Sequence, residues 1–175
     1  MKLKRVIPFG LACGLLVAGA AFAESGGDYG YGTMADRQFA RSLARGSVAD
    51  VSMGRLAKSR AKHPEVREFA SKIVSDHSRG SRILRDLADR RGWRLPTTPD
   101  PKHQAMRRRV ARLQGSAFDR AYMQAMVDDH NRTVAMVRAY ARDGDDPELR
   151  AWARKALPVL IEHQRMARST AQEVM

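Results

Sequence analysis

Cysteine and aromatic residues are scarce in this chain, and both shortages limit what it can be. It has one cysteine in 175 residues, Cys13, and 6% of its residues are aromatic. Cys13 lies in an N-terminal apolar stretch that we expect to be removed. The rest of the chain then has no disulfide framework and no thiolate metal ligand. Its stability must come from packing of a hydrophobic core, for which the length suffices in one domain.

Long hydrophobic runs are also scarce, and the single one lies at the N-terminus. A basic start precedes an apolar run over residues 6–20, and Ala21-Phe22-Ala23 is a small-x-small cleavage signal. We expect a signal peptide over residues 1–23, cleaved after Ala23, and a periplasmic or secreted protein, with peripheral association with the envelope as an option. Gly10 stands where a lipidation signal at Cys13 needs an aliphatic residue, so lipidation is not expected. No later apolar run approaches the roughly 20 residues of a transmembrane helix.

Acidic residues are the third shortage, with 19 Asp and Glu against 32 Lys and Arg. Loss of Lys2, Lys4 and Arg5 with the signal peptide leaves 29 basic residues and a net charge of +10. Export, and the spread of the bases through helices without an aromatic platform, argue against nucleic acid as a partner. The bases form either a solvated helix exterior, which is the simpler interpretation, or a surface for anionic envelope components such as lipopolysaccharide and phospholipid headgroups.

Alternating strand patterns are absent, whereas helical periodicity runs through most of the chain. Residues 24–33 read as a glycine-rich flexible leader and residues 34–173 as a single domain. Helix signals divide that domain into four long helices, with starts at the capping box Thr33–Asp36, at Pro64, at the capping box Ser116–Asp119 and at Asp146-Pro147. The predicted fold is an all-α antiparallel four-helix bundle that alternates up and down, with a short extra helix near residues 101–113 in the long second-to-third connection.

One motif occurs three times, in the second, third and fourth long helices: an acidic residue, histidine, a polar residue and arginine. The copies are residues 76–79, 129–132 and 162–165. Each histidine falls on or beside its helix's apolar stripe. His77 and His130 stand near mid-helix, and His163 lies about 6 Å from that level at the usual helical rise. Gly80 and Thr133, each three residues after a histidine, are small enough to leave space beside the imidazoles.

Two interpretations of these histidines are open. In one, His77, His130 and His163 bind a divalent metal such as zinc, copper or iron, or line a small-ligand site. Asp76, Asp129 and Glu162 would then act as further ligands or as acceptors for the second ring nitrogens. In the other, which the sequence favours, the histidines form a hydrogen-bonded layer of the core.

Several known sites are absent from the sequence. The diiron motif is missing because Val74, Val127 and Leu160 stand three residues before the histidines. No nucleophile elbow, phosphate loop or metalloprotease motif is present. We expect His63 and His103, which stand near helix starts, at the surface.

These residues resemble the exported bacterial domain of unknown function 4142 family. The resemblance rests on residues 54–57, 69–77 and 118–130 and on Leu157-Pro158 with His163, and it covers about residues 34–171. It implies a ferritin-like bundle in an exported protein, often labelled an outer-membrane protein, and no agreed biochemical role. Where the family usually has glutamates in its first helix, this chain has Asp50 and Ser52, so only Asp50 could supply a carboxylate there.

Taken together, these features favour a non-enzymatic binding or stress-related envelope protein. Two alternatives stay open. One is a metal-dependent redox enzyme that uses the same histidines, and the other is a structural protein that associates with anionic envelope surfaces through its arginines.

Overall fold

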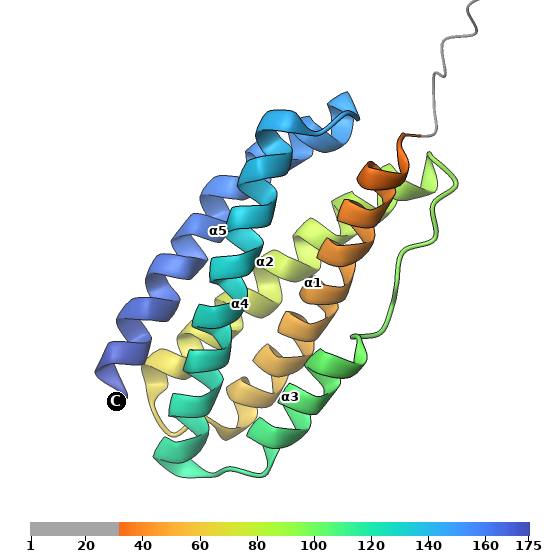
Figure 1. The fold of residues 1–175 in the computed structure, drawn as a ribbon. Coiled ribbons are helices and arrows are strands. Elements are labelled where there is room, and N and C mark those ends of the chain that lie inside the picture. The colour runs from red at the N-terminus through yellow and green to blue at the C-terminus, as the bar shows by residue number, and fades with distance from the viewer. Residues whose placement is uncertain (1–31) are drawn as a thin grey trace, which may run out of the picture.

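Five helices form the part of the chain that the computed structural model describes, residues 32–175. They are α1 (Met34–Arg60), α2 (Pro64–Asp89), α3 (Pro101–Ala111), α4 (Gly115–Asp143) and α5 (Pro147–Glu173). Four of them are long, and α3 is the short helix expected in the long connection (Figure 1). The predicted signal peptide, and all but the end of the predicted leader, lie outside the described residues. Over the described range, no helix has the length and apolarity needed to cross a membrane.

Capping side chains and prolines account for most of the helix starts. Thr33 caps α1 and forms the predicted capping box with Asp36. Pro64, Pro101 and Pro147 occupy the first position of α2, α3 and α5, where the missing N–H of proline would have no helical partner. α5 continues through its internal proline.

The start of α4 differs from the prediction. α4 begins at Gly115 after Gln114, with no side-chain cap, so the predicted capping box of Ser116 and Asp119 is wrong. The fully buried carboxylate of Asp119 instead accepts hydrogen bonds from the backbone N–H groups of Lys62, at 3.1 Å, and His63, at 2.8 Å. It stabilises the α1–α2 junction because the N–H groups at the start of α2 lack helical partners.

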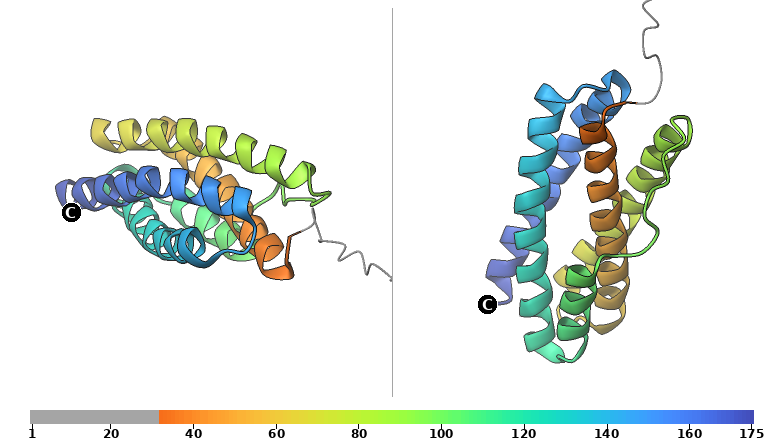
Figure 2. Two further views of the ribbon diagram at one scale, coloured as in Figure 1. Left: turned by 90° about the horizontal axis from the view of Figure 1, so that it is seen from above. Right: turned by 45° about the vertical axis from the view of Figure 1, so that its right-hand side comes forward.

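The four long helices run down, up, up and down in the view of Figure 1. Tight connections at residues 61–63 and 144–146 make two hairpins, α1–α2 and α4–α5. Residues 90–114 cross between the hairpins and carry α3 back along the bundle, in contact with α1 and α4 (Figure 2). α2 and α4 are therefore parallel, and the predicted up-and-down alternation is wrong because this connection is long enough to traverse the bundle. A single long crossover is the order of ferritin-like bundles, and that expectation is confirmed.

The core consists of two apolar clusters. One cluster, nearer the α1–α2 turn, has Phe69, Ile73, Phe118, Tyr122 and Met123 among its members. The other, nearer the α4–α5 turn, includes Phe39, Leu43, Leu84, Val137 and Leu149. On α2, α4 and α5 the three histidines fall between the residues of one cluster and those of the other. The three histidines thus form a polar layer between the two apolar clusters of the core.

Candidate metal centre

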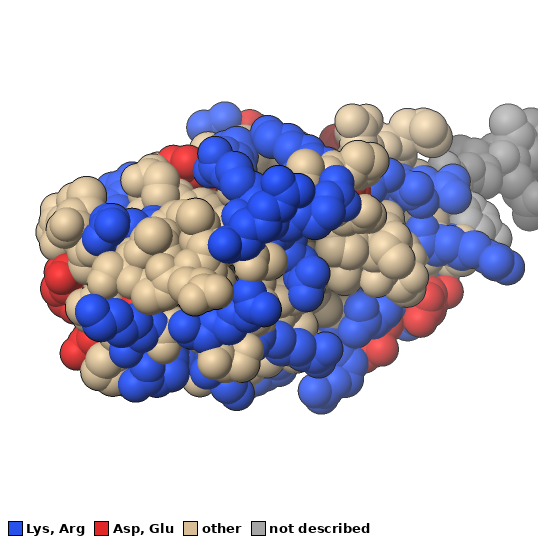
Figure 3. All heavy atoms as spheres, turned by 90° about the horizontal axis from the view of Figure 1, so that it is seen from below, with Lys and Arg blue, Asp and Glu red and all other residues tan. Residues whose placement is uncertain are grey.

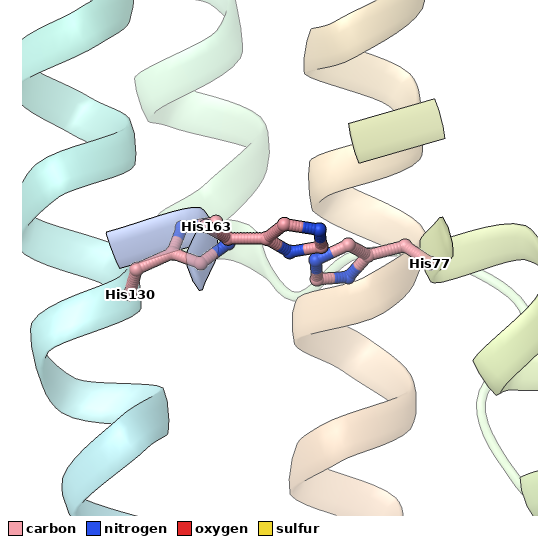
Figure 4. A group of neighbouring side chains, drawn as sticks. All are labelled: His77, His130 and His163. Carbon is pink, nitrogen blue, oxygen red and sulfur yellow. The ribbon is translucent and has the colours of Figure 1, made fainter. Parts of the chain in front are cut away.

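Three histidines from three helices meet in this layer. His77 of α2, His130 of α4 and His163 of α5 are all buried, and their rings point toward one another (Figure 4). The ring centroids lie 5.3 to 5.6 Å apart. One ring nitrogen from each histidine lies within 4.8 Å of the other two. The three histidines, which the sequence places near one level, therefore meet in the structure.

Each imidazole has an oxygen beside one ring nitrogen. His163 Nε2 donates to Asp76 Oδ2 at 3.0 Å, and His130 Nδ1 donates to the carbonyl of Met126 at 3.0 Å. His77 Nδ1 lies 3.4 Å from Oδ2 of Asp50, which comes from α1. A neutral imidazole carries one N–H and one lone pair. For His130 and His163 these contacts assign the N–H to the nitrogen beside the oxygen and leave the lone pair on the other nitrogen. His77 has the same arrangement when Asp50 is ionised.

The other three ring nitrogens have no hydrogen-bond partner among the described residues. They are His77 Nε2, His130 Nε2 and His163 Nδ1, and all three are shielded from solvent. Buried polar atoms are normally paired, so three unpaired acceptors on neighbouring rings require an explanation.

Burial keeps the cluster neutral. It lowers the pKa of His77 to about 3, and repulsion from the other two imidazoles adds to the shift. It lowers the pKa of His130 to about 4, again with a contribution from His163. The pKa of His163 is also lowered by burial, against the opposing hydrogen bond to Asp76. At neutral pH the three imidazoles therefore carry no charge that would repel a cation.

The three acidic residues of the motifs have different surroundings. Asp76 contacts the cluster through His163 and also pairs with Lys72 at 3.0 Å. Asp129 is buried but pairs with Arg132 at 3.0 Å and with His103 at 3.4 Å. Glu162 is partly exposed and pairs with Arg165 at 2.7 Å. Of the three, only Asp76 makes a hydrogen bond to a cluster histidine.

Asp50 and His103 have more buried surroundings than the sequence indicated. Asp50 is fully buried against His77, and burial together with the nearby Asp129 raises its pKa well above the usual range. Its place in the first helix, where the family resemblance implied a carboxylate, was the signal in the sequence. His103, expected at the surface, is instead half-buried between Asp100 and Asp129, and hydrogen bonds from its ring to these carboxylates raise its pKa to about 9.

A pocket of about 600 Å³ reaches the cluster from the surface. His77, His163 and Asp50 line it at the level of the cluster, and it extends along α2 and α5 toward Leu87 and Trp152. Gly80 and Thr133 also line it, as their small size predicts. The buried histidines therefore have a route to solvent.

Comparison with known proteins places the chain in a family and identifies a structure with a similar fold. No curated protein matches its sequence. The fold is similar to that of a predicted secreted protein of the DUF305 family from Streptomyces coelicolor, whose crystal structure is known. The TM-score is 0.67 at 21% identity, over 80% of this chain and 92% of that one. The family model for the domain of unknown function DUF4142 matches residues 24–170, and the chain belongs to that family.

Proposed function

We propose that this protein binds a divalent transition-metal ion in the core of its bundle through His77, His130 and His163. The observation that carries the proposal is the set of three buried, unpartnered ring nitrogens, one on each of three adjacent imidazoles. Bonds from zinc to histidine nitrogen measure about 2.0–2.1 Å. Ring nitrogens that lie up to 4.8 Å apart must therefore move closer together, by ring rotation or a shift of the helices, to bind one ion.

A purely structural layer accounts less well for the same atoms. In such a layer each imidazole would donate with one nitrogen and accept with the other, because an unpaired buried acceptor costs about 1–3 kcal/mol. Here each ring has an oxygen at one nitrogen and nothing at the other. That is the arrangement found around metal-bound histidines, where an oxygen acceptor orients the ring.

The donor set indicates which ions suit the site. Three neutral imidazoles favour zinc or copper over magnesium or calcium, which prefer oxygen ligands. The pocket beside His77 and His163 leaves room for a fourth ligand from solvent. A bound ion would supply a Lewis acid or, with copper, a redox centre, while Asp50, Asp76 and the Met126 carbonyl would hold the imidazoles in place.

Metal analysis tests this proposal directly. We expect the purified wild-type protein, stripped with a chelator and reloaded with Zn²⁺, to retain about one ion per chain by elemental analysis. His77→Gln and His130→Gln should retain none. The metal should also raise the unfolding temperature of the wild type, because a ligand that binds only the folded state stabilises it.

His63→Gln is the matched control, since His63 lies at the start of α2, outside the cluster. It should bind metal as the wild type does. The proposal is wrong if the wild type takes up no zinc, copper or cobalt at micromolar concentration, or if the cluster variants and the control lose metal equally.

For the cellular setting, we propose an exported protein with a binding role rather than an enzymatic one. The basic start, the apolar run over residues 6–20 and Ala21-Phe22-Ala23 support export. N-terminal sequencing of the protein isolated from cell fractions would test it. A first residue of Glu24 in an envelope or medium fraction is the expected result.

A further inference from the structure

Two segments of the chain carry basic residues and no acidic residue. Residues 51–64 contain four Lys and Arg, namely Arg55, Lys58, Arg60 and Lys62. Residues 101–118 contain five, namely Lys102, Arg107, Arg108, Arg109 and Arg112. Elsewhere in the bundle, arginines such as Arg91 and Arg165 pair with carboxylates. None of these nine residues makes an ion pair with a carboxylate in the described structure.

The fold brings the two segments together. α3 packs against α1, and Arg60 Nη1 donates to the carbonyl of Ala111 at 2.6 Å. Seen from the end of the bundle where α3 leads into α4, Lys and Arg cover much of the surface and Asp and Glu are few (Figure 3). The folded protein therefore concentrates a positive charge that the sequence divides between two segments.

A groove opens at the edge of this basic region. It has a volume of about 650 Å³, and its walls include Arg55 of α1, Arg85 of α2 and Arg107 of α3. Serine side chains supply further donors, among them Ser52 and Ser78. No Asp or Glu of the described residues lines it. Three guanidinium groups and several hydroxyls thus face one space without a carboxylate among them.

This donor set matches one ligand chemistry. Guanidinium groups bind phosphate oxygens in bidentate pairs, and charge-assisted hydrogen bonds of this kind are about twice as strong as neutral ones. Like charges around one groove also repel each other, so an anion that enters relieves that repulsion. The three guanidinium groups come from three different helices. A phosphate has three oxygens that can accept from all three groups, whereas a carboxylate has two, so the groove favours a phosphate.

We propose that the groove between α1, α2 and α3 binds a phosphate-bearing ligand, either a soluble polyphosphorylated molecule or the headgroup of an anionic phospholipid. The site is separate from the histidine cluster: it shares no lining residue with the three histidines, and it neither requires nor excludes a metal ion there.

Two binding measurements on the purified protein distinguish the two sources. Calorimetric titration with pyrophosphate tests the soluble ligand. Flotation with phosphatidylglycerol vesicles, compared with phosphatidylcholine vesicles, tests the headgroup. We expect saturable binding in at least one arm, weakened by added salt because exposed charges are screened. In that arm, R55Q/R85Q/R107Q should lower the affinity by about tenfold or more, the factor that corresponds to 1.4 kcal/mol.

The control has the same net charge but leaves the groove intact. Arg37, Arg120 and Arg138 are exposed, make no ion pair with a carboxylate and do not line the groove. R37Q/R120Q/R138Q should therefore bind nearly as the wild type does. Equal losses in the two triple variants would overturn the proposal, since general charge would then explain binding. Absence of binding in both arms would overturn it as well. His77→Gln should keep phosphate binding, which separates this test from that of the metal centre.

Discussion

Asp50, Asp76 and the carbonyl of Met126 hold the three imidazoles of the cluster in different ways. Asp76 and the carbonyl accept hydrogen bonds at 3.0 Å, whereas Asp50 lies 3.4 Å from His77 and is completely buried. Oxygen acceptors of this kind fix the orientation of metal-bound histidines and raise their basicity. Among the described residues, Asp50 is the residue of α1 whose carboxyl group lies beside a cluster histidine.

Asp50→Asn should weaken metal binding by about 10- to 100-fold without abolishing it, the range found when such acceptors are replaced. The amide has nearly the shape of the carboxyl group but cannot ionise when a cation enters the cluster. A competition titration of the zinc complex against a chelator measures the change.

Asp86→Asn is the control, because Asp86 is an exposed residue of α2 at the outer part of the same pocket. Its affinity should match that of the wild type. An unchanged affinity in Asp50→Asn would mean that Asp50 does not position His77.

The buried histidines also predict how the metal-free protein responds to acid. The pKa values of His77 and His130 fall to about 3 and about 4 on folding, below the ordinary value of 6.5. Between these values the unfolded chain binds protons that the folded chain does not, so stability falls as pH decreases from 6.5. Each group contributes up to about 1.4 kcal/mol per pH unit. His103, with its pKa raised to about 9, contributes stability that is fully present below pH 6.5 and is lost only as the pH rises toward 9.

Urea unfolding of the metal-free protein at pH 6.5 and pH 5.0 measures this loss. His77→Gln should lose less stability over the interval than the wild type, because one of the two groups is gone. Equal losses in the two proteins would show that His77 is not held neutral by burial.

At the residue scale, the sequence predicted which histidines meet but not how their second nitrogens are satisfied. The position of His77, His130 and His163 on apolar stripes was sufficient for the first point. The second depends on which carboxylate lies across the bundle, and a carboxylate beside a histidine in sequence diverges from it by about 100° on a helix. For that reason Glu162 pairs with Arg165, while Asp50, from a helix without a cluster histidine, reaches His77.

At the scale of elements, α1 and α2 approach each other closely at one glycine. A Cβ atom on Gly54 would lie 2.8 Å from Cγ2 of Val74 and 3.2 Å from the carbonyl of Ala70. A Cβ atom on Gly46, eight residues earlier in the same helix, would meet nothing within 4 Å. The two glycines therefore have different reasons to be in α1.

Gly54→Ala should destabilise the protein by about 1–3 kcal/mol, because an added methyl group forces a packed interface apart. Gly46→Ala should stabilise it by up to about 1 kcal/mol, since alanine favours helix over glycine and the space is open. Denaturant unfolding of the two variants gives both values. A loss of stability in Gly46→Ala as large as that in Gly54→Ala would contradict this account.

Helix extents were largely predictable, and the capping of α4 was not. Periodicity and proline positions placed the long helices to within a few residues, because those signals are local. Ser116 and Asp119 had the spacing of a capping box, yet Asp119 hydrogen-bonds the α1–α2 junction. A tertiary contact replaced a local one, and spacing along the chain does not record such contacts.

At the scale of the whole molecule, a buried ion pair joins the two hairpins. Arg91, just after α2, makes hydrogen bonds of 2.6 and 2.8 Å to Asp146 at the start of α5, and both side chains are nearly inaccessible. The neighbouring Arg90 pairs with Glu148 at 3.4 Å on the surface. Arg90 and Arg91 thus both pair with a carboxylate, but the pair of Arg90 is exposed and that of Arg91 with Asp146 is buried.

Arg91→Ala should cost about 3–5 kcal/mol, because it leaves the carboxylate of Asp146 buried without its partner. Arg90→Ala should cost less than about 1 kcal/mol, as exposed pairs do. Thermal or urea unfolding compares the two. Similar small losses would mean that water replaces the Arg91 side chain at this joint.

The direction of the helices could not be read from the sequence. The long second-to-third connection was recognised, but a connection of that length can either turn back or cross the bundle. α3 lies against α1 and α4, and this packing takes the chain to the opposite end before α4 starts. His77 and His130 nonetheless meet, since residues at mid-helix share a level whether their helices are parallel or antiparallel.

The division into hairpins has a consequence for the histidines. His77 belongs to the α1–α2 hairpin, and His130 and His163 belong to the α4–α5 hairpin. The three nitrogens form a set only when the two halves are docked, so an ion held by all three acts as a clamp between them. Whatever loosens the docking must weaken the hold on the ion, and loading the ion must strengthen the docking by the same free energy. The affinity for the ion would then report how firmly the two hairpins are docked.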